Sequence, residues 1–323
     1  MHSRFDSYKN EIDTALATLL KDRCPRELYD PMAYVLEAGG KRIRPLLVLL
    51  ACQASGGSED SAWPAALAVE ILHTFTLVHD DIMDGDDLRR GRPTLHKAWD
   101  EATAILAGDG LVTLAYQTLL SASHPSIAEA ARIFTEGLLV LCEGQALDKA
   151  FESREGVALS EYTTMIQKKT GKLLEVACEV GAVLGDATTE IRRHLVAFAG
   201  AWGEAFQIQD DWLDIMADAR VLGKPSCSDV RARKQTFLTL HFFENADASA
   251  RLRFMPFWGA EQMSDADIET VRSLMADSGS LEAAKKAVSR LTDTAESHLK
   301  ALPDTDACRQ FIQLVDRLRD RSY

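Results

Sequence analysis

The sequence predicts an all-α fold on three observations. Almost every long segment repeats its apolar residues with the helical period, and no segment alternates like a half-buried strand over six or more residues. The prolines number only 9 in 323 residues, and they fall where helices are expected to begin or end. With 46% hydrophobic residues, the chain can bury a large core.

Proline and capping residues divide the first half of the chain into helices. Pro31, Pro45, Pro64 and Pro125 each lie at or near an expected helix start. Residues 65–78 are apolar almost all round, so their helix is expected to be surrounded by others. The helices predicted in this half cover residues 3–22, 29–37, 44–55, 63–83, 98–121 and 126–152.

The second half follows the same pattern. Residues 195–208 form a second nearly uncharged stretch, which predicts another central helix. Residues 217–234 lack apolar periodicity and are crowded with charge, so a surface loop is expected there. The predicted helices cover residues 160–184, 189–216, 234–245, 265–277, 281–302 and 304–319. No linker rich in Pro, Gly or Ser interrupts them, which favours one domain over residues 1–323.

Charge and composition exclude several classes of protein. The 36 basic and 49 acidic residues give a net charge of -13, which argues against a nucleic-acid partner. The longest apolar run, residues 46–52, is far shorter than the ~18 residues of a membrane span, and the charged start is unlike a signal peptide. We therefore expect no integral membrane segment and a cytoplasmic location. The 6 cysteines form no C-x-x-C pair, and we expect reduced thiols that mostly fill the core.

Two acidic clusters end the two most apolar helices. In a helix, residues four apart share a face, so the first and last Asp of each cluster project together. Carboxylates gathered at a helix C-terminus repel one another and the helix dipole, and a cation would relieve this. Oxygen ligands without His or Cys favour Mg²⁺. The predicted metal ligands are Asp80, Asp81, Asp84, Asp210, Asp211 and Asp214.

A single D-D-x-x-D is more often a solvated acidic helix end. Two copies, each after about fourteen largely apolar residues, favour instead a cavity that is apolar below and acidic above. A diphosphate with an apolar tail would suit such a cavity.

Basic residues are spaced as if for a second anion. Gly39-Gly40-Lys41-Arg42-Ile43-Arg44-Pro45 places Lys41 and Arg44 at a glycine turn that opens a helix, where both can reach one phosphate. His73 lies two helical turns before Asp80 on the same face. Alternative explanations are a solvated basic turn and an ordinary core histidine.

Two further basic segments have structural alternatives. Arg89-Arg90-Gly91-Arg92-Pro93 follows the first acidic cluster and could simply compensate its charge. In Lys169-Thr170-Gly171-Lys172, Gly171 costs ~1 kcal/mol relative to Ala in a helix and predicts either a kink that exposes backbone carbonyls or a packing glycine.

These motifs together resemble the trans-isoprenyl diphosphate synthase, or polyprenyl synthetase, family. The resemblance extends from GGKRIRP through LVHDDIMD, RRGRPTLH, KTGKL, FQIQDDWLD and GKP. It implies a single-domain, all-α isoprenoid-synthase bundle around a deep central cavity, assembled as a homodimer. It also implies condensation of isopentenyl diphosphate with an allylic diphosphate, with three Mg²⁺ ions in each site.

The resemblance assigns roles residue by residue. The aspartates of both clusters would bind Mg²⁺, less securely so for Asp211 and Asp214. The allylic diphosphate would contact Arg89, Lys169, Lys224 and Lys234, and isopentenyl diphosphate would contact Lys41, Arg44, His73 and Arg90. Oxygens of Thr170 and Gln207 would face the developing cation beside the aromatic wall of Phe206, with Lys169, Thr170 and Gln207 as the catalytic set.

One segment departs from the family pattern. Where the family commonly has GKPxGxDxxxGK, residues 223–234 read GKPSCSDVRARK, with Cys227 and Arg233 at the two later glycine positions. The loop is therefore expected to close differently, which affects the roles of Asp229 and Lys234.

The alternatives are a non-catalytic partner subunit and a terpene cyclase. A silent subunit commonly loses one D-D-x-x-D, and a cyclase would not need the second anion pocket. Phe75, five residues before Asp80, would limit the growing tail. By resemblance it implies an all-trans C20 product, geranylgeranyl diphosphate, with C15 farnesyl diphosphate as runner-up; the alternative is that Phe75 only packs the core.

Overall fold

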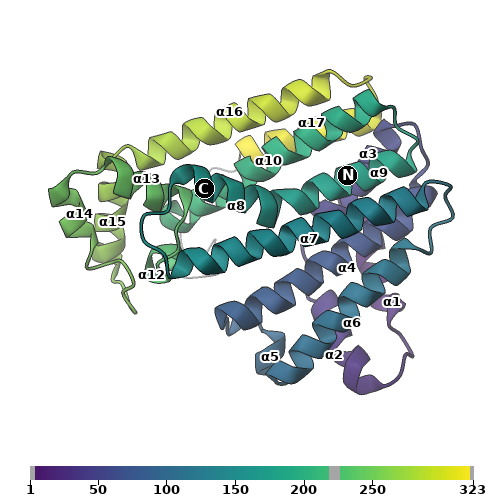
Figure 1. Ribbon diagram of the computed structural model, residues 1–323, viewed down its shortest axis with the longest axis horizontal. Coiled ribbons are helices and arrows are strands. Elements are labelled where there is room, and N and C mark those ends of the chain that lie inside the picture. The colour runs from purple at the N-terminus through teal and green to yellow at the C-terminus, as the bar shows by residue number, and fades with distance from the viewer. Residues whose placement is uncertain (1–3, 218–225, 321–323) are drawn as a thin grey trace. The chain divides into compact units, whose positions relative to one another are not determined.

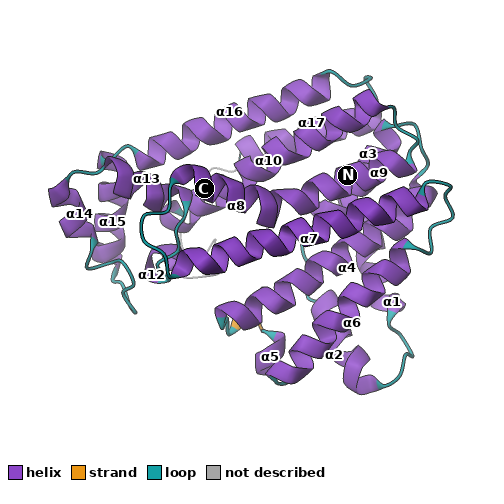
Figure 2. Ribbon diagram, in the orientation of Figure 1, coloured by secondary structure: helices purple, strands orange, loops and turns teal. Residues whose placement is uncertain are grey.

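The computed structural model describes residues 4–217 and 226–320. Almost all of its regular structure is helical (Figure 2), which confirms the all-α prediction. The chain divides into two compact units, which are described separately (Figure 1). Unit 1 comprises Met1–Glu136, Leu173–Val196 and Leu302–Phe311, and unit 2 comprises Gly137–Lys172, Ala197–Ala301 and Ile312–Tyr323. The single domain over residues 1–323 stays a prediction.

Unit 1 is built around helix α4 (Glu59–Asp84), which packs against α3 and α6. Its middle residues, from Ala65 to Leu72, are all buried, as the sequence predicted. Among the described helices, α4 alone is long and apolar enough to cross a membrane, and 67% of its most apolar window is buried. The other elements are α1 (Arg4–Leu19), α2 (Arg26–Leu36), α3 (Ile43–Ala54), α5 (Leu95–Ala98), α6 (Glu101–Leu119) and most of α9 (Lys172–Leu184).

A two-residue hairpin follows α4 and was not predicted from sequence. Its antiparallel strands are β1 (Leu88–Arg89) and β2 (Arg92–Pro93). Arg90 and Gly91 both have positive φ, 54° and 73°, as the favoured two-residue hairpin turn requires. The hairpin is too short for the alternation by which longer strands are detected.

Unit 2 contains the second apolar helix, α10 (Thr189–Met216), from Ala197 onward. The predicted helix 160–184 is divided: a π-helical segment, η1 (Gln167–Gly171), separates α8 (Leu159–Ile166) from α9. The remaining elements are α7 (Ile127–Glu152), α12 (Ser228–Arg231), α13 (Phe237–Asn245), α14 (Ala248–Phe254), α15 (Asp265–Asp277), α16 (Ser280–Lys300) and α17 (Asp306–Arg319), of which α7 and α17 have residues in both units.

The predicted surface loop at residues 217–234 is wrong for residues 226–231 and holds for residues 232–234, which are exposed and outside any helix; residues 218–225 lie outside the described residues. Ser228–Arg231 form α12, and Cys227 and Val230 are fully buried. Hydrogen bonds to Asp214 of α10 hold this charged segment, which therefore needs no apolar periodicity to be ordered. Four of the six cysteines are buried and all six are free thiols, in agreement with the prediction.

Candidate active site

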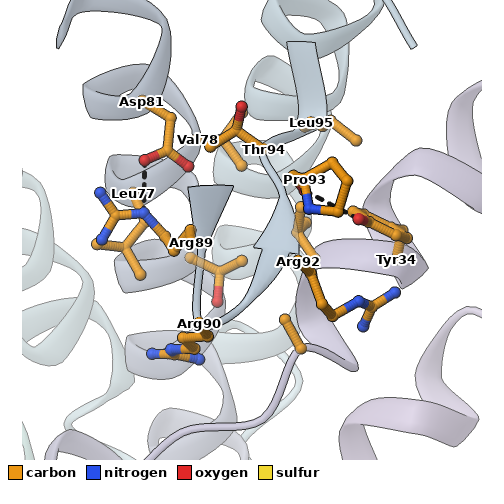
Figure 3. A pocket seen from close by; sticks show the side chains of 13 residues that line it. Tyr34, Leu77, Val78, Asp81, Arg89, Arg90, Arg92, Pro93, Thr94 and Leu95 are labelled. Atoms are coloured by element: carbon orange, nitrogen blue, oxygen red, sulfur yellow. Dashed lines mark hydrogen bonds and ion pairs between the residues drawn. The ribbon is translucent and has the colours of Figure 1, made fainter. Parts of the chain in front are cut away.

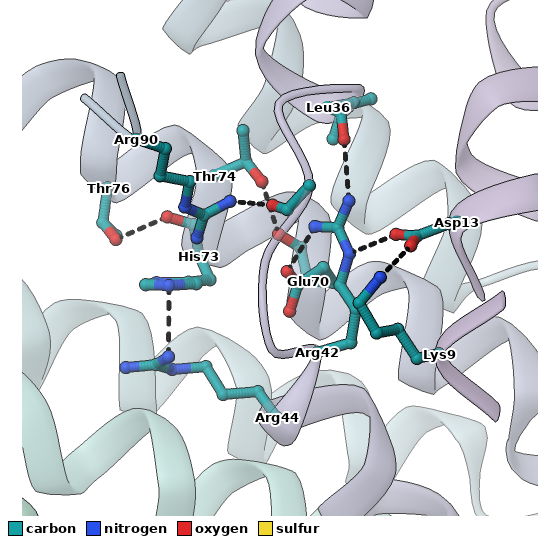
Figure 4. A network of polar contacts seen from close by, with 11 residues as sticks. Lys9, Asp13, Leu36, Arg42, Arg44, Glu70, His73, Thr74, Thr76 and Arg90 are labelled. Carbon is teal, nitrogen blue, oxygen red and sulfur yellow. Dashed lines mark hydrogen bonds and ion pairs between the residues drawn. The ribbon is translucent and has the colours of Figure 1, made fainter. Parts of the chain in front are cut away.

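A basic cluster in unit 1 gathers three predicted anion-binding residues. Arg44 at the start of α3 and His73 in the middle of α4 lie 3.1 Å apart, between Nη1 and Nε2. Arg90 approaches the same place from the hairpin and donates to the Gly39 carbonyl (Figure 4). A Cβ on Gly40 would lie 2.9 Å from Arg90 Nη1, so the glycine turn is what admits this guanidinium.

Arg42, to which the sequence assigned no role, holds the turn in place. It takes the left-handed conformation at the N-terminus of α3, with φ 51°. Its guanidinium binds Glu70 Oε1 at 2.6 Å, Asp13 Oδ1 at 2.7 Å and the Leu36 carbonyl at 2.8 Å (Figure 4). The buried Glu70 carboxylate is thereby directed to Arg42. Within residues 4–217 and 226–320, neither Arg44 nor Arg90 is paired with a carboxylate.

The electrostatics of this cluster favour an external anion. Burial lowers the pKa of Arg44 to about 10 and, together with Arg44 and Arg90, lowers the pKa of His73 well below its usual value. His73 is therefore neutral and accepts a hydrogen bond from the charged Arg44. The buried Nε of Arg44 has no hydrogen-bond partner. Two guanidinium groups without a carboxylate form a site for a phosphate group.

The first acidic cluster occupies the last turn of α4. Asp80 and Asp84 lie one turn apart and are partly exposed, and Gly85, with φ 71°, ends the helix. Asp81 is buried and binds Arg89 Nε at 2.5 Å through Oδ1, beside a small pocket (Figure 3). Burial raises the pKa of Asp81 to about 6 although Arg89 opposes the shift. The hairpin thus directs Arg89 to the acidic cluster and Arg90 to the basic cluster.

The second acidic cluster ends α10, and its middle residue is enclosed by donors. Asp211 is buried; its Oδ2 accepts from the Tyr162 hydroxyl at 2.5 Å and the Phe237 amide at 3.0 Å. Its Oδ1 accepts from Gln207 Nε2 at 3.0 Å. Burial and the nearby Asp229 raise the pKa of Asp211 to about 7. No sequence motif pointed to Tyr162.

Asp214 anchors the segment that departs from the family pattern. Its carboxylate accepts from Ser228 Oγ at 2.5 Å and from the Asp229 amide at 3.0 Å. Its carbonyl accepts from the Cys227 amide at 2.7 Å. Cys227 has φ 57° and is fully buried, so a non-glycine residue keeps the left-handed conformation there. Lys234 follows, with its amide bonded to the Asp229 carbonyl at 2.8 Å.

The π-helical segment η1 contains Lys169 and Thr170. Lys169 Nζ lies 2.5 Å from Asp148 Oδ2, and Thr170 Oγ1 donates to Gln207 Oε1 at 3.0 Å. A Cβ on Gly144 of α7 would lie 2.3 Å from the Lys169 amide nitrogen, whereas a Cβ on Gly171 would meet nothing closer than 3.7 Å. The packing glycine is therefore Gly144, and the kink predicted at Gly171 is present as a π-helical turn.

The other predicted residues are distributed over both units. Phe75 is partly buried and contacts the His79 ring at 4.7 Å between centroids, so it is no fully buried core residue. On α10, the ring centroids of Phe206 and Trp202 lie 5.9 Å apart. Lys41 is exposed on the glycine turn. Lys224 lies outside the described residues.

The two acidic clusters are compatible with Mg²⁺ without forming a closed cage. In the part of the chain that the structure describes, no three His, Cys, Asp or Glu side chains are placed to hold a metal ion. Mg²⁺ in phosphate sites usually takes one or two carboxylates, retained waters and the phosphate oxygens of the substrate. The partly exposed Asp80, Asp84 and Asp210 provide such carboxylates.

The chain is similar to known proteins over most of its length. A sequence profile described as polyprenyl synthetase matches residues 25–275. A geranylgeranyl diphosphate synthase of Methanosarcina mazei is 36% identical over 323 residues, 98% of each chain. A geranylfarnesyl diphosphate synthase of Natronomonas pharaonis is 36% identical over 97% of this chain and 95% of that protein. The crystal structure of a Pyrococcus horikoshii geranylgeranyl pyrophosphate synthetase superposes with a TM-score of 0.93 at 37% identity, covering 99% of this chain and 98% of that one.

Proposed function

This chain belongs to the polyprenyl synthetase family and is a prenyltransferase, and from that premise we propose that it condenses isopentenyl diphosphate with allylic diphosphates in an Mg²⁺-dependent reaction. Among its relatives are proteins named geranylgeranyl diphosphate synthase and short chain isoprenyl diphosphate synthase. The proposed product is the all-trans C20 compound geranylgeranyl diphosphate. The proposed runner-up is C15 farnesyl diphosphate.

The observation that carries this proposal is the basic cluster of Arg44, His73 and Arg90. It offers a phosphate site that has no carboxylate ligand for a metal, because Glu70 is directed to Arg42. Condensation requires a second diphosphate held separately from the metal-bound one, and Lys41, Arg44, His73 and Arg90 would hold it. A terpene cyclase has one diphosphate and no use for this cluster. A silent subunit has no use for two complete acidic clusters.

We propose that Asp80, Asp84 and Asp210 are the main metal ligands. The carboxylate oxygens of Asp211 and Asp214 accept hydrogen bonds from Tyr162, Gln207, Ser228 and two backbone amides. They would position Asp210 and contribute to the metal site chiefly through this support. Bound Mg²⁺, three ions by family resemblance, would neutralise the departing diphosphate.

The protein residues would stabilise the negative charge of the allylic diphosphate and the positive charge of the allylic cation. Arg89, Lys169 and Lys234 would bind the oxygens of the allylic diphosphate, as would Lys224, so that cleavage of the C–O bond leaves a stabilised anion. The hydrogen-bonded chain from Thr170 through Gln207 to Asp211 fixes polar oxygens beside the proposed position of the allylic cation. The double bond of isopentenyl diphosphate attacks that cation, and a proton is lost to the released diphosphate. No protein nucleophile is needed.

The product length rests on Phe75. It is partly buried on α4, after the buried residues 65–72 and five residues before Asp80. An aromatic ring there would stop the tail after the C20 stage. Two relatives named for C20 synthesis support this length, whereas a relative of similar identity is named for geranylfarnesyl diphosphate.

Assembly and location are proposed from the exposure of apolar side chains near α6 and from the burial of α4. The side chains of Ile105 and Leu106 on α6, and of Leu120 directly after it, are exposed, which is typical of a surface that pairs with another copy. We propose a homodimer through this surface. A cytoplasmic location is proposed because the apolar helix α4 is mostly buried in unit 1.

The function is tested by removing one ligand from each acidic cluster. Asp80→Ala and Asp210→Ala are each expected to lower the condensation rate by orders of magnitude at saturating Mg²⁺, because the leaving diphosphate would be poorly neutralised. The matched control is Asp87→Ala, a mostly exposed aspartate beyond α4 that pairs with Lys97. Near-normal turnover in either cluster variant, measured with protein of unchanged helical circular dichroism, would defeat the assignment.

A further inference from the structure

A basic and apolar segment, residues 251–258, lies on the surface of unit 2; we call it the 251–258 patch. Arg251, Leu252, Arg253 and Met255 are exposed, with Leu252 at 74% and Met255 at 50%. Among the described residues, Leu252 is the most exposed of the large hydrophobic side chains. Phe257 and Trp258, which complete the patch, are partly exposed.

The patch is held on a fixed backbone. Phe254, in its middle, is fully buried and packs on the Phe242 ring at 4.6 Å and the Phe243 ring at 5.5 Å. The Trp258 amide donates to the Met255 carbonyl at 3.3 Å, which continues the turn beyond α14. In Figure 1, α14 lies beside α13 and α15 at one end of unit 2. The apolar side chains are therefore presented outward by a packed element.

The charges of the patch lack partners of opposite sign. Arg251 Nε donates to the Ala246 carbonyl at 2.9 Å, and in the described part of the chain neither Arg251 nor Arg253 is paired with a carboxylate. In the same unit, Arg154, Arg272 and Arg319 each have such a pair. Two arginines flanking an exposed leucine are complementary to an anionic surface with an apolar layer beneath it.

Backbone hydrogen bonds connect the patch to the second acidic cluster. The Gly259 amide, directly after the patch, donates to the Val230 carbonyl of α12 at 3.1 Å. The first residues of α12 in turn bind Asp214 through Ser228 and Asp229. α12 is thus hydrogen-bonded both to the residue that follows the patch and to Asp214 at the end of α10.

We propose that the 251–258 patch docks the protein on the surface of an anionic lipid bilayer. Arg251 and Arg253 bind lipid phosphates, while Leu252 and Met255, followed by Phe257 and Trp258, enter the headgroup layer. Docking is peripheral and requires no membrane-spanning helix. Lipid binding does not depend on the catalytic activity, although it would place the second acidic cluster near a membrane that dissolves an apolar product.

The test is sedimentation of the full-length protein with phosphatidylcholine vesicles, with or without phosphatidylglycerol. Wild-type protein is expected to bind the anionic vesicles, more weakly at high salt, and to bind neutral vesicles little. Arg251→Gln with Arg253→Gln is expected to weaken binding roughly thirtyfold, from about 1 kcal/mol for each arginine. Leu252→Glu with Met255→Glu is expected to abolish it.

Matched controls separate the patch from general charge and apolarity. Arg26→Gln with Arg290→Gln removes two exposed arginines elsewhere, and Leu139→Glu alters another exposed leucine; both are expected to bind like wild type. Condensation in vesicle-free solution checks that each variant is folded.

Three results would overturn the proposal. They are no sedimentation of wild type with anionic vesicles, equal binding by the patch variants, and release by inorganic phosphate at the lipid phosphate concentration. The last result would indicate a site for free phosphate.

Discussion

The Tyr162 hydroxyl donates a 2.5 Å hydrogen bond to Oδ2 of Asp211, and both groups are buried. This contact fixes α8 to the end of α10 beside Asp210. Burial raises the pKa of Asp211, and three hydrogen-bond donors, one of them the Tyr162 hydroxyl, compensate for the burial of its carboxylate.

Tyr162→Phe should weaken both the fold and the reaction. Removing a donor from a buried carboxylate is expected to lower the free energy of unfolding by about 1.5–3 kcal/mol, because the ring packing stays and only the hydroxyl is lost. Urea unfolding and the condensation rate measure the two effects. The control is Tyr116→Phe, whose hydroxyl bonds only Thr135 at 2.9 Å near the surface. Equal stability of the two variants would contradict the role given to Tyr162.

Gly144→Ala tests how η1 is positioned. The added Cβ would lie 2.3 Å from the Lys169 amide nitrogen, so η1 must move away from α7, at a cost of about 1–3 kcal/mol. We expect a higher KM for the allylic diphosphate. Gly171→Ala is the control, since its Cβ would meet only the Ile166 carbonyl oxygen, at an ordinary contact distance of 3.7 Å. If Gly171→Ala were the more damaging variant, the packing glycine would be misidentified.

Arg44→Ala and Arg90→Ala should affect the two substrates unequally. Loss of a charge-assisted contact of about 1.5–3 kcal/mol predicts a roughly 10- to 150-fold higher KM for isopentenyl diphosphate and little change for the allylic substrate. Arg132→Ala, which removes a surface arginine paired with Glu136, is the control. An equal rise in both KM values would show that the two anion pockets are wrongly assigned.

Phe75→Ala should lengthen the products. Its ring is partly buried and contacts His79, so its removal opens space along α4 below the acidic cluster. Chain lengths are measured by chromatography of the dephosphorylated products, and Phe75→Leu is expected to give an intermediate distribution. An unchanged distribution from folded, active Phe75→Ala would rule out Phe75 as the floor.

The sequence predicted what depends on local spacing. The bounds of α10 and α15 match their predicted ranges. The contact between Arg44 and His73, which are 29 residues apart, was implied only by the family resemblance. The acidic clusters were equally readable, since residues four apart on a helix necessarily share a face.

Contacts between distant segments could not be predicted in this way. Tyr162 and Asp211 are 49 residues apart, and Gly144 lies 25 residues before Lys169; no periodicity relates them. The segment at residues 226–231 lacks an apolar pattern because hydrogen bonds to Asp214 hold it. The short helix α14 was not predicted either. Its apolar side chains are partly on the exposed face, so the usual pattern of one apolar and one polar face is absent.

The proposed condensation is tested most directly by incubating the purified protein with Mg²⁺ and isopentenyl diphosphate. Dimethylallyl, geranyl and farnesyl diphosphate are added in separate reactions, and the products are sized. We expect condensation with each primer, an all-trans C20 product, and no reaction after Mg²⁺ is removed by chelation. Absence of any elongated product from folded protein with all three primers would contradict the proposed condensation.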